Sequence, residues 1–365
     1  MEINMDSVKS KAQDAAEFIK KNRYGICIVT GLIVIIVASQ LFKRRAAIKR
    51  MSLNEDKCQA ANAAENTIFV VLNGTDGETE TLQEIFNKAL CPGRIRVAAQ
   101  NEKSIGAYDA KARRNKVMRG TRSYIENVRL TRSSTLFSKV RESYRGEKYV
   151  FTFTACPTMQ LRDGWDEEGI RMHTDAPPKS VLSICPSGRD NVPGFPCADV
   201  HASSTALVIS TAPCTDAPPR AIPALFFYAP CSVALGTAWA AVPSLTNAVS
   251  AAWEPAFLSA AFFCAGYNFV VPTSTLMLAA PPNSATISTH ESMPFKRELF
   301  RPMPRQLSEF EENAGIVLEE GASTRCSARA VMGLSAHARP EEILVKFGSW
   351  AEYDRVLNSL TVGIK

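Results

Sequence analysis

The sequence predicts an α/β fold in which a mainly parallel sheet is flanked by helices and preceded by an N-terminal transmembrane helix. Between residues 67 and 185, short β-branched segments alternate with segments of helical periodicity. Strand, helix and strand joined by short turns build a parallel sheet. Residues 24–42 form an uncharged, mostly apolar run. The whole chain has 365 residues, 46% hydrophobic and 21% charged, which is the composition of a globular protein.

The apolar run from Tyr24 to Phe42 predicts a single-pass membrane anchor. At about 1.5 Å per residue it would span about 28 Å, close to the thickness of a bilayer core. A cleaved signal peptide would have a shorter apolar region nearer the N-terminus. Basic residues lie on both sides of the run, so the side of the membrane that holds the main domain stays open. We expect a tail at 1–23, the anchor at 24–42 and a basic and polar stalk at 43–66.

The remaining chain is expected to hold one folded domain, 67–350, followed by a C-terminal helix or tail, 351–365. Runs of β-branched residues predict strands at 67–72, 94–99, 149–154 and 179–185. Apolar residues at helical spacing predict helices at 79–90, 133–144, 165–173, 305–320 and 340–360. Residues 186–223 are rich in Pro, Ser, Ala and Cys and are interpreted as loops. The apolar segments between 221 and 272 are interpreted as buried core because Pro and Gly interrupt them.

Charge is unevenly distributed along the chain. The net charge is +6, and residues 101–150 alone hold 13 Lys/Arg and 5 Asp/Glu. Such a stretch can bind sulfated glycan or another polyanion, although a solvated surface is the plainer interpretation. No aromatic interleaving accompanies it, so nucleic acid is not expected. Ten cysteines include no CxxC pair, which argues against zinc clusters. The candidate polyanion-binding residues are Lys111, Arg113, Arg114, Lys116, Arg119, Arg122, Arg129 and Arg132.

Seven short strings occur in an order that resembles one enzyme family. They are "IFVVLNGTDGE", "CPGRIRVAAQ", "GEKY" with a later "WD", "KSVLSICP", "AIPALFF" with a later "VP", "GYNFVVP", and "RCSARAVMGL" with "KFG". This order resembles the hydroxyproline-type N-acetylglucosaminyltransferases that modify a ubiquitin-ligase adaptor. The resemblance covers Thr67 to Trp350. It implies a GT-A-like fold that binds a nucleotide sugar, with Mn²⁺ and a UDP-sugar as cofactor and donor if the protein is active.

The chain departs from that family at the positions that carry chemistry. The family's Asp-Ser-His string falls on Thr154, Ala155 and Cys156, or two residues later in a second register. The two acids of its Phe-x-Gly-Glu-Glu string fall on Ala260 and Ala261. Divalent metals in such enzymes need oxygen or imidazole ligands. We therefore interpret the metal site as degenerate, at the carboxyl end of a central strand. The remaining candidates for a relocated site are Asp163, Asp166, Glu254 and, as a metal ligand, His290.

These observations favour a membrane-anchored, glycosyltransferase-like pseudoenzyme that acts by binding a glycan, a protein or a membrane partner. An anchored, degenerate enzyme would suit a viral envelope protein. One alternative is an active UDP-sugar-dependent glycosyltransferase with relocated metal ligands. Another is an anchored structural protein that binds polyanions through its basic stretch. No cofactor is expected under the first and third hypotheses.

Overall fold

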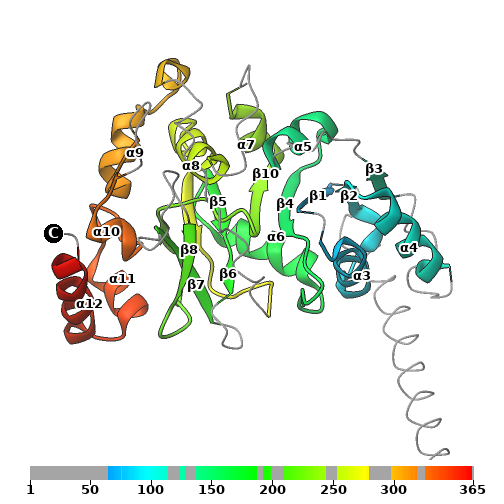
Figure 1. The fold of residues 1–365 in the computed structure, drawn as a ribbon. Helices are drawn as coiled ribbons and strands as arrows, with labels where there is room; N and C mark the ends of the chain where they lie inside the picture. Colours follow the sequence, from blue (N-terminus) through cyan, green and yellow to red (C-terminus); the bar gives the residue numbers. More distant parts are fainter. Residues whose placement is uncertain are drawn as a thin grey trace, which may run out of the picture. The chain divides into compact units, whose positions relative to one another are not determined.

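A computed structural model describes residues 65–74, 76–113, 124–127, 136–186, 192–198, 209–243, 253–278, 297–318 and 325–363. They all belong to one compact unit, Ala60–Lys365. Figure 1 shows the described helices and strands of this unit. The predicted tail, the predicted anchor and nearly all of the predicted stalk lie outside the described residues, and the domain boundaries stay a prediction.

The centre of the unit is an eight-stranded mixed sheet in the order β3-β2-β1-β4-β10-β5-β11-β9. The first four strands in this order run parallel. The next strand, β10, lies antiparallel between β4 and β5, while β11 is parallel to β5 and β9 is antiparallel at the edge. The strands are β1 (Ile68–Asn73), β2 (Ile95–Ala99), β3 (Ile125–Asn127), β4 (Tyr149–Thr154), β5 (Ser180–Ser183), β9 (Ile222–Ala224), β10 (Cys231–Leu235) and β11 (Asn268–Val271).

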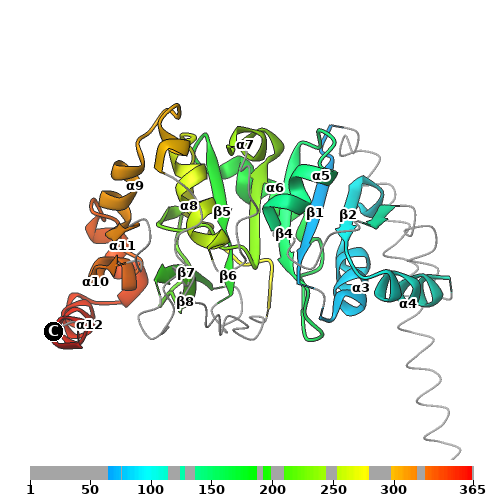
Figure 2. The ribbon, with the colours of Figure 1, turned by 45° about the horizontal axis from the view of Figure 1, so that its top comes forward.

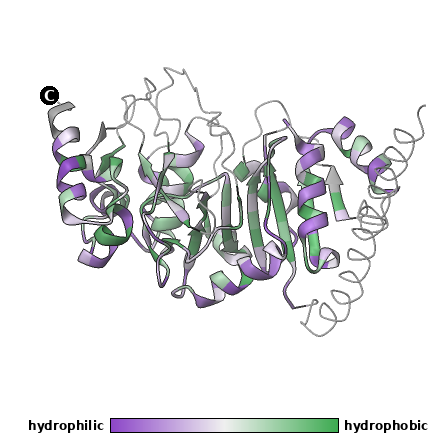
Figure 3. Cartoon of the chain, turned by 90° about the horizontal axis from the view of Figure 1, so that it is seen from below, coloured by the Kyte–Doolittle hydropathy of each residue, from purple (hydrophilic) through white to green (hydrophobic). Residues whose placement is uncertain are grey.

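Helices cover both faces of this sheet, which explains why its strands are apolar on both sides. Alternate residues of a strand point to opposite faces. In β1, Ile68, Val70 and Leu72 pack into one core with α3 (Glu78–Lys88), α4 (Glu102–Ala112) and α6 (Trp165–Asp175). Phe69 and Val71 pack into a second core with α5 (Leu136–Ser143), α7 (Gly236–Ala241) and α8 (Glu254–Cys264). Figure 3 shows hydrophobic strands beside helices that also carry hydrophilic residues.

Smaller elements complete the unit, and several of them differ from the sequence prediction. Residues 186–223, interpreted as loops, contain two strands of a small antiparallel sheet beside the β5–β11 half of the large one. The helix predicted over 340–360 is two helices, because Gly348 adopts a left-handed φ of 76° between them. Figure 2 shows α9 to α12 together. The elements are η1 (Pro92–Arg94), β6 (Cys185–Pro186), β7 (Pro193–Ala198), β8 (Ile209–Pro213), η3 (Arg297–Phe300), α9 (Leu307–Ala314), β12 (Ile316–Val317), β13 (Arg325–Cys326), α10 (Ala328–Val331), α11 (Pro340–Phe347) and α12 (Trp350–Gly363).

The predicted fold class is wrong in two respects. The sheet is mixed, because β10 and β9 run against their neighbours. Both strands come from the apolar segments that the sequence assigned only to buried core, and apolar composition does not determine strand direction. The second error concerns the membrane: in the described part of the chain, no helix is both long enough and apolar enough to cross a bilayer. No helix of the described residues thus supports the predicted single-pass anchor and membrane localisation.

Candidate functional site

The chain reverses its direction across the sheet between β1 and β4. It adds β2 and then β3 on one side of β1, and α5 then leads to β4 on the other side. The carboxyl ends of β1 and β4 meet here, with Asn73 opposite Thr154. In open α/β sheets, ligands bind outside the carboxyl ends of strands at such a switch point. We therefore take this end of β1 and β4 as the candidate site.

The segment after β4, residues 154–158, is held against the start of α3. The Thr81 hydroxyl donates to the carbonyl oxygen of Cys156 at 3.2 Å and accepts from the N–H of Cys156 at 3.0 Å. The Cys156 thiol lies 3.1 Å from the Thr158 hydroxyl. At Gly77, which has a φ of 71°, a Cβ atom would lie 2.1 Å from the Pro157 nitrogen. The main chain of 156–157 and the turn before α3 are thus in direct contact at the carboxyl end of β4.

Three buried charged side chains gather at the carboxyl end of β1. Lys139 on α5 is 1% exposed and donates to the carbonyl oxygen of Leu72 at 2.7 Å. Glu78 accepts the N–H groups of Gln100 and Asn101, just after β2, at 2.7 and 2.8 Å. Glu254, at the start of α8, accepts the N–H of Phe137 at 2.6 Å. Together they connect both helical layers to the strand ends.

Burial and mutual attraction act in opposite directions on these groups. Burial lowers the pKa of Lys139 to about 8, while attraction to Glu254 and Glu78 acts against that decrease. Burial raises the pKa of Glu78, and its two main-chain hydrogen bonds partly offset the effect. With the lysine protonated and both glutamates ionised, the formal charge of the three groups is −1.

Sequence reasoning did not identify Glu78 and Lys139. A signal for Lys139 was present, since it lies on the apolar side of α5 with the buried residues Leu136, Val140 and Ser143. A lysine on the buried side of an amphipathic helix indicates a buried partner. Glu78 directly follows the left-handed Gly77 at the start of a helix, where an acid is also expected for the helix dipole. The position of Glu78 in the sequence could not distinguish a buried charge at the site from an acid that only interacts with the helix dipole.

The two predicted aspartates lie away from the carboxyl end of β4. Residues 155–164 run back along α3, and Gly164 donates to the carbonyl oxygen of Lys88 at its far end. Since α3 has 11 residues, its two ends are about 15 Å apart. Asp163 forms a 2.8 Å ion pair with Lys88 there. Asp166 is buried, 2.9 Å from Arg94, and also accepts the N–H groups of Leu90 and Cys91.

Some of the other predicted positions lie in the core, some lie on the surface, and some lie outside the described residues. Ala260 and Ala261 are fully buried within α8, so their side chains contact the core. Lys111 and Arg113 lie on the surface at the end of α4, where they pair with Glu80 and Asp109. His290 and the other six basic candidates lie outside the described residues. Of the named candidates that the structure describes, only Glu254 contributes to the charged group beside β1.

No metal-binding group could be assembled from the described residues. Among them, no set of three or more His, Cys, Asp or Glu side chains is placed to share an ion. The seven cysteines that the structure describes as free thiols are all buried. Thr154 and Cys156 offer a hydroxyl and a thiol, whereas hard divalent cations prefer carboxylate and carbonyl oxygens.

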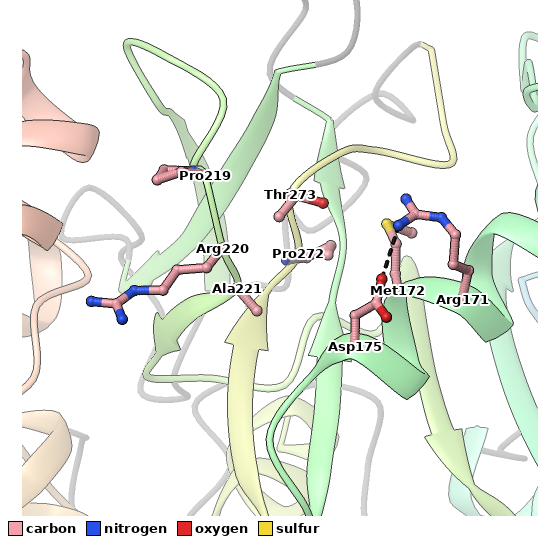
Figure 4. Close-up of a pocket in the computed structure, with 8 residues that line it drawn as sticks. All are labelled: Arg171, Met172, Asp175, Pro219, Arg220, Ala221, Pro272 and Thr273. Atoms are coloured by element: carbon pink, nitrogen blue, oxygen red, sulfur yellow. Dashed lines mark hydrogen bonds and ion pairs between the residues drawn. The ribbon is translucent and has the colours of Figure 1, made fainter.

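A separate hollow of about 320 Å³ lies at the carboxyl end of β11, beside α6. Pro272 and Thr273 line it just after the strand, and Figure 4 shows them between Ala221 and the end of α6. Two arginines reach its border, but both are already paired. Arg171 binds Asp175 at 2.9 Å, and Arg220 forms a 2.5 Å ion pair with Glu341. These carboxylates reduce the attraction of the hollow for an anion.

The fold and the site define an α/β protein with a doubly covered mixed sheet and a buried charged group at its switch point. The sequence matches no known family model, and no curated protein has significant similarity to it.

Proposed function

We propose that this chain is a glycosyltransferase-like protein that binds a glycan and does not carry out metal-dependent sugar transfer. The resemblance of residues 67–350 to N-acetylglucosaminyltransferases is the reason for proposing a glycan as the ligand. The observation that carries the loss of transfer is the contact of Thr81 with both main-chain polar groups of Cys156. The contact holds the main chain of residue 156 just after β4, and the side chain that the sequence provides at this position is a thiol and not a carboxylate or imidazole.

The positions of the acids support the same proposal. Metal-dependent transfer needs a cation that neutralises the diphosphate leaving group, held by oxygen or nitrogen ligands at about 2.0–2.6 Å. Asp163 and Asp166 lie at the far end of α3 from Cys156, and both already have cationic partners. Glu254 lies on the other side of the sheet, at the start of α8. An active enzyme with relocated ligands would require these groups to converge.

Charge argues against a nucleotide sugar at the switch point. The parallel order β3-β2-β1-β4 is that of a mononucleotide-binding half. However, Glu78, Lys139 and Glu254 sum to a formal charge of −1 beside β1. This net negative charge would repel a diphosphate in a low-dielectric environment, whereas it would not repel an uncharged glycan.

The test combines thermal stability, metal binding and turnover of the full-length protein. UDP-N-acetylglucosamine and UDP-glucose are added with and without Mn²⁺, unfolding is followed by differential scanning fluorimetry, and UDP release is measured. We expect no Mn²⁺-dependent stabilisation, no loss of the electron paramagnetic resonance signal of free Mn²⁺, and no UDP release. Neutral oligosaccharides should show saturation transfer from the protein in NMR.

Two results would support the alternatives. Mn²⁺-dependent UDP release that disappears in Glu254→Gln or Asp166→Asn would establish a relocated active site. Heparin retention that disappears when the basic residues of 111–132 are neutralised, without any glycan signal, would establish polyanion binding.

A further inference from the structure

A pocket of about 610 Å³ lies at the edge of the sheet opposite the switch point. Asn268 begins β11 there, Ala224 ends the antiparallel edge strand β9, and Phe263 lies near the end of α8. The remaining walls come from α9 and from the turn before α11. The volume falls within the range of about 300–1,000 Å³ that is typical of small-molecule sites.

The wall of this pocket carries acceptors and donors of both charges. Glu309, Glu312 and Glu342 supply three carboxylates, and Arg305 and Arg339 supply two guanidinium groups. Carboxylates only accept hydrogen bonds, and guanidinium groups only donate them. With the nearby histidine neutral, the formal charge of the lining is −1. The wall therefore carries hydrogen-bond donors and acceptors with a formal charge of −1, beside apolar residues such as Phe263 and Phe269.

Several of these groups are held in place by partners within the protein. The Arg305 guanidinium lies 4.8 Å from the centre of the Phe263 ring and donates to the Asn268 side-chain oxygen at 2.9 Å. Arg339 Nε donates to Glu342 at 3.1 Å, and the Glu342 side chain is only 4% exposed. A guanidinium has five N–H donors, so these contacts leave Arg305 and Arg339 with donors for a ligand, while the exposed Glu309 and Glu312 supply the acceptors that a ligand can reach.

We infer that this pocket binds a neutral, polyhydroxylated ligand, namely a short oligosaccharide. Each sugar hydroxyl both donates and accepts, so one ligand can bond the carboxylates and the arginines together. An anionic sugar would meet three carboxylates, and a cationic one would meet two arginines. The inference rests on the proposed function, because it names the binding site for the glycan.

A peptide is the main rival occupant, and the edge strand argues against it. Peptides commonly bind a sheet edge by adding a strand through main-chain hydrogen bonds. The middle residue of β9 is Pro223, which lines the pocket, is exposed and has no N–H to donate. Strand addition at β9 would therefore lack one of its hydrogen bonds, while side-chain recognition of hydroxyl groups does not depend on it.

The test measures binding of three neutral trisaccharides, chitotriose, maltotriose and cellotriose, to the full-length protein by calorimetry and saturation-transfer NMR. Sialyllactose and an uncharged pentapeptide serve as comparison probes. Ser335→Trp fills the pocket without removing a charge, and Glu312→Ala removes an exposed acceptor. Glu341→Ala is the matched control, because it removes a surface carboxylate of α11 that does not line the pocket.

We expect at least one neutral trisaccharide to bind. Ser335→Trp should weaken it by about tenfold or more, and Glu312→Ala by several-fold, while Glu341→Ala should change the Kd by less than about twofold. Melting temperatures confirm that each variant is folded. Tighter binding of sialyllactose or of the peptide than of every neutral sugar overturns the inference.

Failure of the pocket and failure of the proposed function give different results. If neutral sugars bind and both pocket variants leave this binding unchanged, the inference about the pocket is wrong, while the proposal of glycan binding stands. Pocket-dependent binding together with Mn²⁺-dependent UDP release overturns the loss of transfer and preserves the pocket. The absence of any neutral sugar binding overturns the pocket and glycan binding together.

Discussion

The hydroxyl of Thr81 contacts both main-chain polar groups of Cys156, which lies 75 residues later in the chain. Both residues are buried. A single side chain thus pairs with a main-chain donor and acceptor just after β4 ends, and the acceptor also receives the N–H of Met159 at 3.1 Å. This contact fixes the path of the chain at the candidate site.

Replacing Thr81 should therefore destabilise the protein through Cys156. Thr81→Val keeps the shape of the side chain but removes this partner from the buried N–H of Cys156, while the Cys156 carbonyl oxygen still accepts from the N–H of Met159. We therefore expect a loss of about 1–3 kcal/mol in the free energy of unfolding. Urea unfolding followed by circular dichroism measures it. Thr81→Ser retains the hydroxyl and should lose clearly less. Equal losses in the two variants would show that the methyl group, and not the hydroxyl, matters.

Substitution of two glycines before α3 distinguishes the stability cost of a left-handed φ from the cost of a steric clash. Gly74 and Gly77 have φ values of 79° and 71°. A Cβ at Gly74 would meet no atom of the described residues within 4 Å, but at Gly77 it would lie 2.1 Å from the Pro157 nitrogen. Gly74→Ala should cost about 1 kcal/mol from its φ alone, and Gly77→Ala should cost at least about 3 kcal/mol. Similar melting temperatures for the two variants would contradict the close packing of 156–157 against this turn.

Asp163 and Asp166 should respond very differently to the same substitution. The Asp166–Arg94 pair has fully buried side chains, whereas Lys88 and Asp163 are 36% and 63% exposed. Asp166→Asn breaks the buried pair and disturbs the hydrogen bonds from Leu90 and Cys91, although Arg94 keeps its ion pair with Glu167. It should therefore cost about 3 kcal/mol. Asp163→Asn should cost less than about 1 kcal/mol. Chemical denaturation of both variants measures their free energies of unfolding. A large loss for Asp163→Asn would show that the exposed ion pair contributes substantially to stability.

His173 should make stability decrease as the solution becomes acidic. Burial lowers its pKa below the ordinary value of 6.5, although its contact with the Ser180 carbonyl acts in the other direction. Below pH 6.5 the unfolded chain therefore takes up this proton more readily than the folded chain, and stability is lost as pH falls from 6.5 to the folded pKa.

The difference between wild type and His173→Gln isolates that effect. Glutamine can still donate to the Ser180 carbonyl but does not titrate near neutral pH. From pH 7.5 to pH 5, the unfolding free energy of wild type should fall relative to that of the variant. Parallel curves over this interval would mean that His173 does not contribute to the acid sensitivity of the fold.

The sequence by itself determined the local elements whose signals are short-range. The strand predicted at 149–154 has those bounds in the structure, and the helix predicted from Trp165 begins at that residue. β-branched runs and helical periodicity depend on neighbours within a few residues, so they can be identified without a fold.

The tertiary structure alone decided how these elements pair and which charges meet. β10 lies in an apolar segment that could have joined the sheet in either direction, and only its contacts with β4 and β5 make it antiparallel. The sequence made Asp166 a candidate site residue, but the loop after β4 places it at the far end of α3. Glu78, Lys139 and Glu254 come from three helices and meet at the end of β1. Contacts between residues far apart in sequence depend on the folded path of the whole chain, which no local pattern encodes.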